Sequence, residues 1–486
     1  MFESVERGRK VAKRAFKKRE AVLRTGLLRA QHAAAERKIP ILIIVAGVEG
    51  AGRGQIVDRL NAWMDTRGIV THAFWDESNE ERDRPRYWRF WRCMPRRDQL
   101  AIMFGSWYTQ PIFERAMGES GKGDFDREMH RISELEQMLT LDGALMIKLW
   151  FHLSKRSQAR RLKAESEFKH SPFMELAVKN YDALASAAER AIRLTDNVQH
   201  PWVVIEAQDP RYRDLTAGQA ILDRLNTRLA ARGLENDNRE TREGAQLEDS
   251  TILDQLDLSA SLEEEQYEKK LEQYQSDIYK RAWTTHNERV NVVAVFEGWD
   301  AAGKGSAIRR LTQAIDARLY HVITVGAPTD EELAHHYLWR FWRHVPRAGE
   351  FTIYDRSWYG RVLVERVEGL AQPTQWRRAY REINDFEEQL VDHGIVLMKY
   401  WIHISPDEQL ARFREREETP WKQHKITRQD WRNREKWDAY ERAVNEMIAR
   451  TSTEHAPWTL IAGNDKKYAR IRILEEFRER LGAALD

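Results

Sequence analysis

Cysteine is almost absent from this chain of 486 residues, in which Cys93 is the single one. One thiol excludes internal disulfides, so we expect the protein in a reducing compartment, the cytoplasm. The longest apolar run, around residues 39–48, contains Pro40 and is too short to span a bilayer. The first residues are charged and lack the apolar region of a secretory signal. We therefore expect no membrane partner.

A net charge of one sign is also missing, since 79 Lys and Arg stand against 77 Asp and Glu. This balance creates no overall field that attracts nucleic acid, so we expect no nucleic-acid partner and only local basic sites. With 42% hydrophobic and 32% charged residues, the composition is that of a folded globular protein. The length predicts two or three domains.

The sequence VNVVAVFEGWDAAGKGSAIRR, residues 290–310, is typical of a strand, a glycine-rich turn and a helix. Residues 298–304 satisfy G-x-x-x-x-G-K, the phosphate loop whose backbone N–H groups point at phosphate oxygens while the lysine, here Lys304, reaches the outer phosphates. A helix that begins near residue 305 would add the positive end of its dipole. The other phosphate-binding residues predicted in this turn are Gly298, Ala302, Gly303, Gly305 and Ser306.

Asp300 lies inside the same turn. A carboxylate that faces a polyanion is repelled unless a cation or a proton transfer lies between them. Asp300 therefore indicates Mg²⁺ or activation of an acceptor oxygen, and a solvated turn residue is the alternative.

The chain contains an internal duplication. GVEGAGRGQ at residues 47–55 matches GWDAAGKGS at residues 298–306, an offset of 298 − 47 = 251, and the same offset relates WRFWRCMP to WRFWRHVP and one SWY to another. Further on, Trp202 pairs with Trp458 at an offset of 256, so the second copy has five extra residues between 405 and 437. We predict a first domain over residues 1–232, a charged linker over 233–260 and a second domain over 261–486.

Strand-like runs alternate with helical stretches in each copy. In the second copy the runs are VNVVAVF, HVITVG, EFTIYD, IVLMKYWIHI and WTLIAG, and each copy begins with a helical segment, residues 4–38 and 262–283. This alternation predicts the α/β class: a parallel sheet with helices on both faces, repeated in tandem. Ligands of such sheets bind beyond the carboxyl ends of the strands.

EFTIYD ends in Asp355, the position and residue type of a Walker B carboxylate that holds Mg²⁺. Arg356 follows and can bridge phosphate oxygens. A plain turn aspartate is the alternative for Asp355.

Further basic residues are candidates for binding a polyanion. Arg340, Arg343 and Arg347 recur at helical spacing beside Trp339 and Trp342. Such a guanidinium ladder suits a linear polyanion, and the alternative is an amphipathic helix with its tryptophans inward.

The region beyond Ser405 is dense in arginine and lysine, including Arg412 and Arg416, as in the helical lid that closes over the phosphates in nucleotide kinases. A solvated, charged helix pair is the alternative. Lys399 lies inside an apolar strand, where a buried lysine needs an anion, and we predict that Lys399 binds phosphate.

The motifs EGWDAAGKG, YLWRFWRHVP, YDRSWYGR, KYWIHIS and EQLARFRER resemble the second polyphosphate kinase family, and the duplicated layout resembles its tandem-domain branch. The phosphate loop and the Asp-Arg pair are also similar to those of thymidylate kinases, which share the fold.

The resemblance implies transfer of a phosphoryl group from inorganic polyphosphate to a nucleotide, with Mg²⁺ or Mn²⁺ and no covalent enzyme intermediate. Its tandem branch is associated with making ADP from AMP, and we expect a homo-oligomer. The implied catalytic residues are Asp300, Lys304, Asp355 and Arg356, with Asp300 and Asp355 at the metal. ADP as acceptor, ATP as donor, and polyphosphate binding without turnover are the alternatives.

The first copy departs from this pattern at each decisive position. Lys304 is matched by Arg53, Asp300 by Glu49, Asp355 by Phe104 and Arg356 by Gly105. An aromatic ring in place of the acid cannot coordinate Mg²⁺. We predict an inactive sister domain of the same fold.

Overall fold

The computed structural model describes residues 1–164, 172–231 and 252–485. None of the helices in these ranges has the length and apolar character that crossing a bilayer requires. The chain divides into two compact units, and each unit contains one parallel sheet. Unit 1 consists of Met1–Asp76, Arg89–Glu235 and Thr329–Trp339, and unit 2 of Glu77–Trp88, Asn236–Pro328 and Arg340–Asp486.

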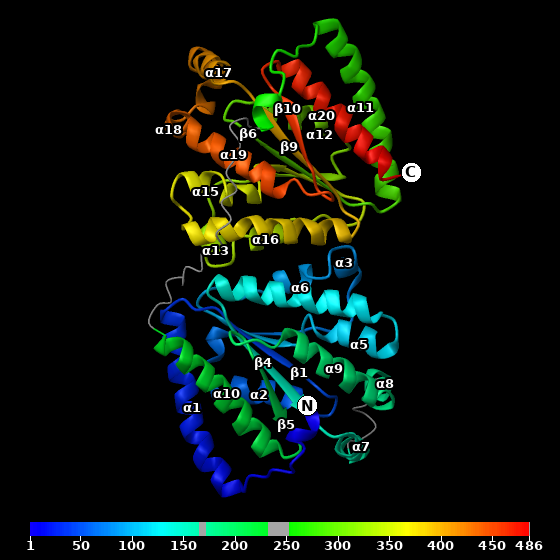
Figure 1. Ribbon diagram of the computed structural model, residues 1–486, viewed down its shortest axis with the longest axis vertical. Helices are drawn as coiled ribbons and strands as arrows, with labels where there is room; N and C mark the ends of the chain where they lie inside the picture. The colour runs from blue at the N-terminus through cyan, green and yellow to red at the C-terminus, as the bar shows by residue number, and fades with distance from the viewer. Residues whose placement is uncertain (165–171, 232–251, 486) are drawn as a thin grey trace. The chain divides into compact units, whose positions relative to one another are not determined.

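The sheet of unit 1 has five parallel strands in the order β2-β3-β1-β4-β5. Its strands are β1 (Ile41–Gly47), β2 (Ile69–Ala73), β3 (Leu100–Phe104), β4 (Leu145–His152) and β5 (Trp202–Glu206). One face is covered by α1 (Lys13–Glu36), α2 (Arg53–Trp63) and α10 (Pro210–Ala230). The other face is covered by α5 (Thr109–Met117), α6 (Lys122–Leu141) and α9 (Tyr181–Thr195) (Figure 1).

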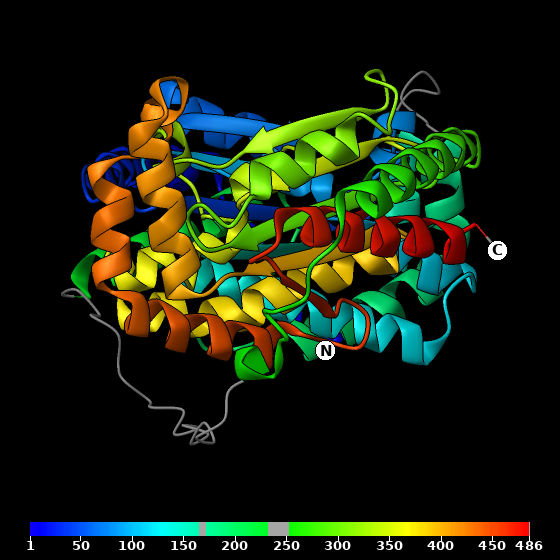
Figure 2. The same cartoon turned by 90° about the horizontal axis from the view of Figure 1, so that it is seen from above.

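The sheet of unit 2 repeats this topology in the order β10-β9-β6-β8-β7. Its strands are β6 (Val292–Gly298), β7 (Tyr320–Thr324), β8 (Phe351–Asp355), β9 (Val396–His403) and β10 (Trp458–Ala462). One face packs against α11 (Glu264–Asn287), α12 (Lys304–Thr312) and α20 (Lys466–Ala483), and the other against α16 (Pro373–Asp392) and α19 (Trp437–Thr451). Figure 2 shows α11 and α20 side by side, and the lid helices α17 (Pro406–Glu418) and α18 (Arg428–Glu435) at one end of the sheet.

Short elements complete the described chain. In the first copy these are η1 (Phe2–Val5), η2 (Thr66–Gly68), α3 (Asn79–Arg82), α4 (Trp88–Trp91), α7 (Lys155–Ala164) and α8 (Pro172–Lys179). The others are η4 (Ile252–Gln255), α13 (Asp330–Leu333), α14 (Trp339–Trp342), η5 (Trp358–Arg361), α15 (Val364–Val367) and η6 (Pro420–Lys425).

The structure confirms the predicted α/β class, and all five strands expected in the second copy form. The central strands are buried along nearly their whole length, as their β-branched runs predict for strands covered on both faces. The helix predicted over residues 4–38 begins only at Lys13. Residues 233–251 of the expected linker lie outside the described residues, and residues 252–255 form η4.

The predicted ladder of Arg340, Arg343 and Arg347 does not lie on one continuous helix, so the predicted helical spacing is wrong. Only Trp339–Trp342 is helical, so Arg343 and Arg347 lie beyond α14. Trp339 and Trp342 are buried, in agreement with the alternative in which they face the core.

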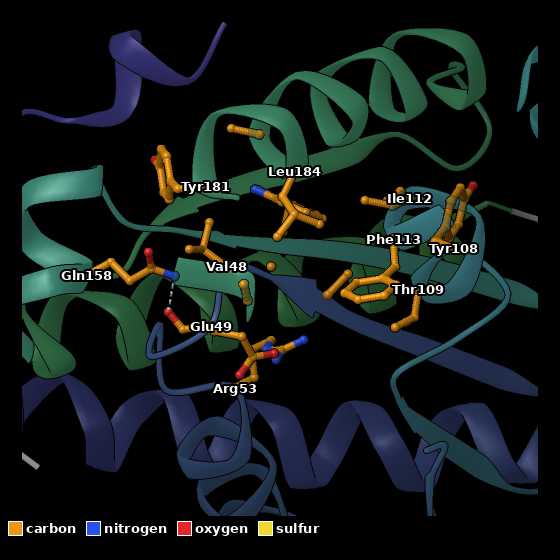
Figure 3. Close-up of a pocket in the computed structure, with 15 residues that line it drawn as sticks. Val48, Glu49, Arg53, Tyr108, Thr109, Ile112, Phe113, Gln158, Tyr181 and Leu184 are labelled. Atoms are coloured by element: carbon orange, nitrogen blue, oxygen red, sulfur yellow. Dashed lines mark hydrogen bonds and ion pairs between the residues drawn. The ribbon is translucent and has the colours of Figure 1, made fainter. Parts of the chain in front are cut away.

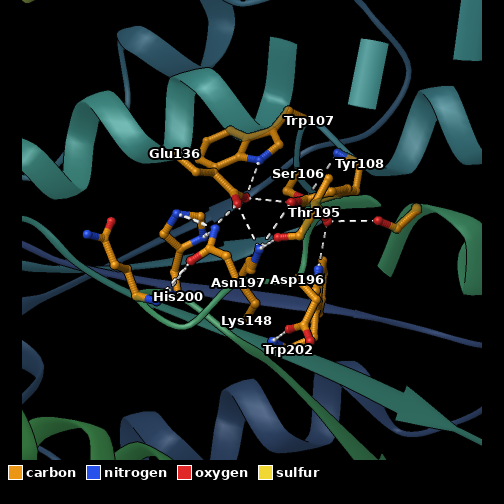
Figure 4. A network of polar contacts seen from close by, with 12 residues as sticks. Ser106, Trp107, Tyr108, Glu136, Lys148, Thr195, Asp196, Asn197, His200 and Trp202 are labelled. Carbon is orange, nitrogen blue, oxygen red and sulfur yellow. Dashed lines mark hydrogen bonds and ion pairs between the residues drawn. The ribbon is translucent and has the colours of Figure 1, made fainter. Parts of the chain in front are cut away.

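Each copy has a buried lysine that is paired with a carboxylate. Lys148 donates to Glu136 Oε2 (2.8 Å) and to the carbonyl of Thr195 (2.8 Å), while Trp107 and Tyr108 donate to Glu136 Oε1 (Figure 4). Both charged side chains are 0% exposed. A charge at this depth is tolerated because every partner group is in place.

Lys399 occupies the matching position in β9. Its Nζ donates to Glu387 Oε2 (2.7 Å), the carbonyl of Thr451 (2.7 Å) and the hydroxyl of Tyr359 (3.0 Å). Three donors to three acceptors use all its N–H groups. Lys399 is 1% exposed, so our prediction that it binds phosphate is wrong: the anion it needs is Glu387.

Replacing Lys399 with Met should lower the free energy of unfolding of the second copy by about 3 to 5 kcal/mol, because Glu387 stays buried without its cation. Denaturant unfolding measures this change. Lys148→Met is the matched variant and should act on the first copy in the same way. The double variant Lys399→Met with Glu387→Gln should recover most of the loss, and equal stability of the single variant and the wild type would refute the account.

Candidate functional site

The glycine-rich turn follows β6 and leads into α12, as the sequence predicts. Gly298 has φ of 150°, and a Cβ there would lie 2.5 Å from the carbonyl oxygen of Ile402. Gly303, with φ of 113°, precedes the first residue of α12, Lys304. Only glycine fits these two positions without strain, so the turn adopts the shape of a phosphate loop at the carboxyl end of the central strand.

Lys304 folds back over the turn. Its Nζ donates to the carbonyls of Gly298 (2.7 Å) and Trp299 (3.1 Å). Burial and the nearby Arg356 lower the pKa of Lys304, although Asp300 and other carboxylates oppose this. The amine thus lies among the loop carbonyls, ready to exchange them for phosphate oxygens.

The other turn residues predicted from the sequence lie around this lysine. The Ser306 hydroxyl donates to the carbonyl of Gly303 (2.9 Å), and Ala302 is buried. A Cβ at Gly305 would lie 3.9 Å from Oδ2 of Asp355. The start of α12 therefore faces the acid at the end of β8.

The Asp-Arg pair reaches the loop because β8 lies beside β6, where Asp355 pairs with Phe296 in the parallel register. Arg356 has φ of 66°, a conformation that costs a non-glycine residue free energy. Its Nη2 donates to Asp300 Oδ1 (3.0 Å), and Asn433 of the lid donates to Asp300 Oδ2 (2.8 Å). The strained backbone conformation at Arg356 therefore places its guanidinium group beside Asp300 in the site.

A buried carboxylate that sequence reasoning missed lies at the base of the site. Glu297 is 5% exposed and accepts a hydrogen bond from the Ser357 hydroxyl (2.9 Å). Burial raises the pKa of Glu297, while Lys304 acts in the opposite direction. The sequence contains a signal for this residue, because Glu297 stands in the motif EGWDAAGKG and its match in the first copy is Ala46.

The lid arginine Arg412 has a different role from the predicted one. Its Nε donates to Glu408, and its two Nη atoms donate to the carbonyls of Ala301, Ala302, Gly463 and Asn464 at 2.6 to 2.9 Å. All five donors are used and the side chain is 3% exposed. Arg412 is therefore not available to phosphate, and it braces the loop instead.

The remaining basic residues are spread more widely than predicted. Arg340 donates to the carbonyl of Gly326 after β7 (3.2 Å). Arg343 lines a cavity together with His321 and Thr352. This cavity is separate from the one beside Asp300, because the two have no lining residue in common. Arg416, in the last turn of α17, adds positive charge beside Arg412.

A cavity of about 670 Å³, including space open to solvent, lies beside Asp300. Trp299 lines it and stacks on Trp437 at 3.7 Å between ring centroids. Sequence reasoning missed its polar lining residues from the lid and α19, because contacts between distant segments leave no local pattern. These residues are Gln409, Asn433 and Tyr440.

The donor set fits Mg²⁺. Within the described residues, no group of three or more His, Cys, Asp or Glu side chains could hold a metal by itself. Mg²⁺ at nucleotide sites uses one or two carboxylates and completes its shell with water and phosphate oxygens. Asp300 and Asp355, on the loop and at the end of β8, meet that requirement.

The matched turn of the first copy keeps the backbone, but its cation and its carboxylate are paired with each other. α2 begins at Arg53 after Gly52, which has φ of 79°. Arg53 forms an ion pair with Glu49 and lies 5.6 Å from the ring of Phe104. Gly105 has φ of 74°, close to that of its match Arg356.

Comparison with known proteins gives one consistent result. The family description "Polyphosphate kinase 2 (PPK2)" matches residues 10–232 and 261–485. A polyphosphate:AMP phosphotransferase of Pseudomonas aeruginosa is 44% identical over 493 residues, which cover 100% of this chain and 99% of the relative. One from Acinetobacter johnsonii is 37% identical and covers 92% of both chains. A crystal structure of polyphosphate kinase 2 from P. aeruginosa superposes with a TM-score of 0.90 at 44% identity, covering 100% of this chain and 99% of that one.

His403 makes the second copy sensitive to acid. Its Nδ1 accepts hydrogen bonds from Trp299 Nε1 (3.0 Å) and Trp401 Nε1 (3.5 Å), and indole N–H groups only donate. Burial lowers the pKa of His403 to about 4. Its folded pKa is below the unfolded value, so its stabilising effect is complete above pH ~6.5 and is lost as the pH falls towards about 4.

We expect this histidine to contribute about 2 kcal/mol to the fall in unfolding free energy between pH 7 and pH 5. Denaturant unfolding at both pH values measures it. His403→Gln, which keeps an acceptor but does not titrate, should lose this part of the pH dependence. The same slope in both proteins would contradict the assignment.

Proposed function

The chain belongs to the polyphosphate kinase 2 family, and we propose that it transfers a phosphoryl group from inorganic polyphosphate to AMP to give ADP. The observation that supports this best is the meeting of Lys304, Asp300, Asp355 and Arg356 at the carboxyl edge of β6 and β8. Relatives that match 92 to 100% of the chain carry the name of that activity.

We place the active site in the second copy and propose that residues 1–232 form an inactive sister domain. The second copy has a lysine at the start of the helix and an acid at the end of β8. In the first copy the loop arginine is paired with Glu49, and Phe104 replaces the acid. Phosphoryl transfer depends on positioning and charge, and only the second copy has both.

Each group of the second copy has a proposed task. Lys304 exchanges its loop carbonyls for oxygens of the transferring phosphoryl group, and Arg356 stabilises the charge that develops there. Asp300, held by Arg356 and Asn433, fixes the lid against the cavity that receives the acceptor. Gly298, Gly303, Gly305 and Ser306 direct backbone and hydroxyl groups to the phosphates, and Arg416 adds positive charge from the lid.

Asp300 and Asp355 would hold Mg²⁺, or Mn²⁺ in its place. Such an ion would supply positive charge that offsets the negative charge of the phosphates. We further propose that the protein works in the cytoplasm as a homo-oligomer. Sedimentation of the purified chain tests the second point.

ADP is a second candidate acceptor. A P. aeruginosa ADP-polyphosphate phosphotransferase is 37% identical over 242 residues, which cover 48% of this chain and 79% of that protein. That relative matches about half of this chain, whereas the relatives named for AMP match 92 to 100% of it, so AMP is the favoured acceptor.

A matrix of donors and acceptors tests the proposal. The purified chain is supplied with polyphosphate or ATP as donor and with AMP or ADP as acceptor, with and without Mg²⁺. ADP formed from AMP and polyphosphate without any nucleoside triphosphate supports the proposed reaction. Turnover with ATP alone, or polyphosphate binding without turnover, would overturn it.

Lys304→Ala and Asp355→Asn should each lower kcat by about 10²- to 10³-fold, because each removes a charge that acts on the transferring group. The matched first-copy variants Arg53→Ala and Phe104→Leu should leave turnover unchanged. Initial rates of ADP formation measure all four. Loss of turnover in Arg53→Ala, with the fold intact, would instead place chemistry in the first copy.

A further inference from the structure

The first copy contains a cavity at the place where the second copy has the cavity beside Asp300. It measures about 650 Å³, against about 670 Å³ in the second copy, including space open to solvent in both. Val48 and Glu49 of the turn, Ile112 and Phe113 of α5, and Tyr181 and Leu184 of α9 surround it, as Figure 3 shows. Loss of the catalytic residues has therefore not closed the cavity.

Its walls are more apolar than those of the second cavity. Four polar side chains around the second cavity are replaced in the first: Glu297 by Ala46, Arg356 by Gly105, Asn433 by Ala177 and Tyr440 by Leu184. The hydroxyls of Tyr108 and Tyr181 are used elsewhere, on Glu136 and on the carbonyl of Leu153. Such walls suit a flat apolar ring better than a charged group.

In the first copy, the turn that matches the phosphate loop pairs its own cation with its own carboxylate. Arg53 forms an ion pair with Glu49, and the two side chains lie together at the edge of the cavity (Figure 3). Both are mostly shielded from water, at 16% and 17% exposure. A phosphate would have to displace Glu49 and leave that carboxylate without its cation.

One buried polar atom in this cavity has no partner. Gln158 is 1% exposed, and its Nε2 donates to the carbonyl of Glu49 (3.1 Å), which fixes the orientation of the amide. Its Oε1 has no hydrogen-bond partner among the described residues, and Figure 3 shows it turned away from Glu49. In the second copy Gln409 accepts from Arg434 (3.2 Å), whose match is Val178.

A donor without a partner lies on the same cavity. Trp150 is 6% exposed and lines it, and its Nε1 has no acceptor within the part of the chain that the structure describes. Its match Trp401 donates to His403. Buried polar atoms normally have hydrogen-bond partners. The first cavity therefore has one acceptor and one donor that are available to a ligand.

We propose that this cavity binds an uncharged, flat heteroaromatic ligand of the nucleoside class. An N–H group of the ligand donates to Gln158 Oε1, a ring nitrogen or hydroxyl accepts from Trp150 Nε1, and the ring packs against the apolar walls. A nucleotide or polyphosphate is excluded, because the loop offers no free cation. The choice of adenosine as probe rests on the proposed function, in which the matched cavity holds AMP.

Calorimetric titration of the full chain with adenosine tests this site. Leu184→Trp fills the cavity and should weaken the first-copy binding by more than about tenfold, while AMP turnover stays unchanged. The matched variant Tyr440→Trp fills the cavity of the second copy and should leave first-copy binding intact while turnover falls. Gln158→Met should weaken binding about fivefold, because one hydrogen bond is lost.

Two outcomes would overturn the proposed site. One is that the wild type and Leu184→Trp bind adenosine with equal affinity. The other is that the first copy of the Tyr440→Trp variant binds AMP as tightly as it binds adenosine. Thermal unfolding of each variant shows whether the fold is kept, and Leu184→Phe serves if Leu184→Trp unfolds. Binding is read independently of turnover. A chain that binds adenosine but makes no ADP would refute the proposed function and leave this site standing.

Discussion

The register of the central strand between its two neighbours is the constraint on which the site depends. Pairing of β6 with β8 sets Asp355 opposite Phe296, and pairing with β9 sets Ile402 against Gly298. The close approach to the Ile402 carbonyl forces glycine at the first position of the turn, and the turn then delivers Lys304 to the start of α12. A slip of one residue would turn every one of these groups to the other face of the sheet.

Comparison of the two copies distinguishes the features that the fold requires from the features that differ between the copies. Both keep the strand order, the glycines of the turn and the buried lysine-glutamate pair, since each of these supports packing. Arg161 of the first copy also braces its loop through the carbonyl of Gly50, as Arg412 does in the second copy. What differs is the set of charges that face the cavity. A sheet of this kind thus tolerates different side chains at its carboxyl edge while its topology is kept.

Local patterns in the sequence were sufficient for the fold and for the turn. The apolar runs, the glycine spacing and the duplication predicted a parallel sheet in each copy, the five strands of the second copy, and the place of Lys304, Asp355 and Arg356. The wrong expectations concern side chains whose partners come from distant segments. Lys399 and Arg412 carry the charge that a phosphate site needs, but Glu387 and four backbone carbonyls already satisfy them. Spacing alone does not reveal such partners, and it also gave no sign that the helix of the arginine ladder ends at Trp342.

The stacked indoles of Trp299 and Trp437 have a consequence for spectroscopy. Two identical chromophores stacked with ring centroids 3.7 Å apart couple their electronic transitions, so the circular dichroism of the indoles responds to the orientation of the two rings. One ring belongs to the glycine-rich turn and the other to the first residue of α19, directly after the lid helices. The first copy has Val48 and Tyr181 at these positions, so this stacked pair is a feature of the second copy. The stacked pair therefore gives an intrinsic optical signal that depends on how the glycine-rich turn lies against α19, without any attached dye.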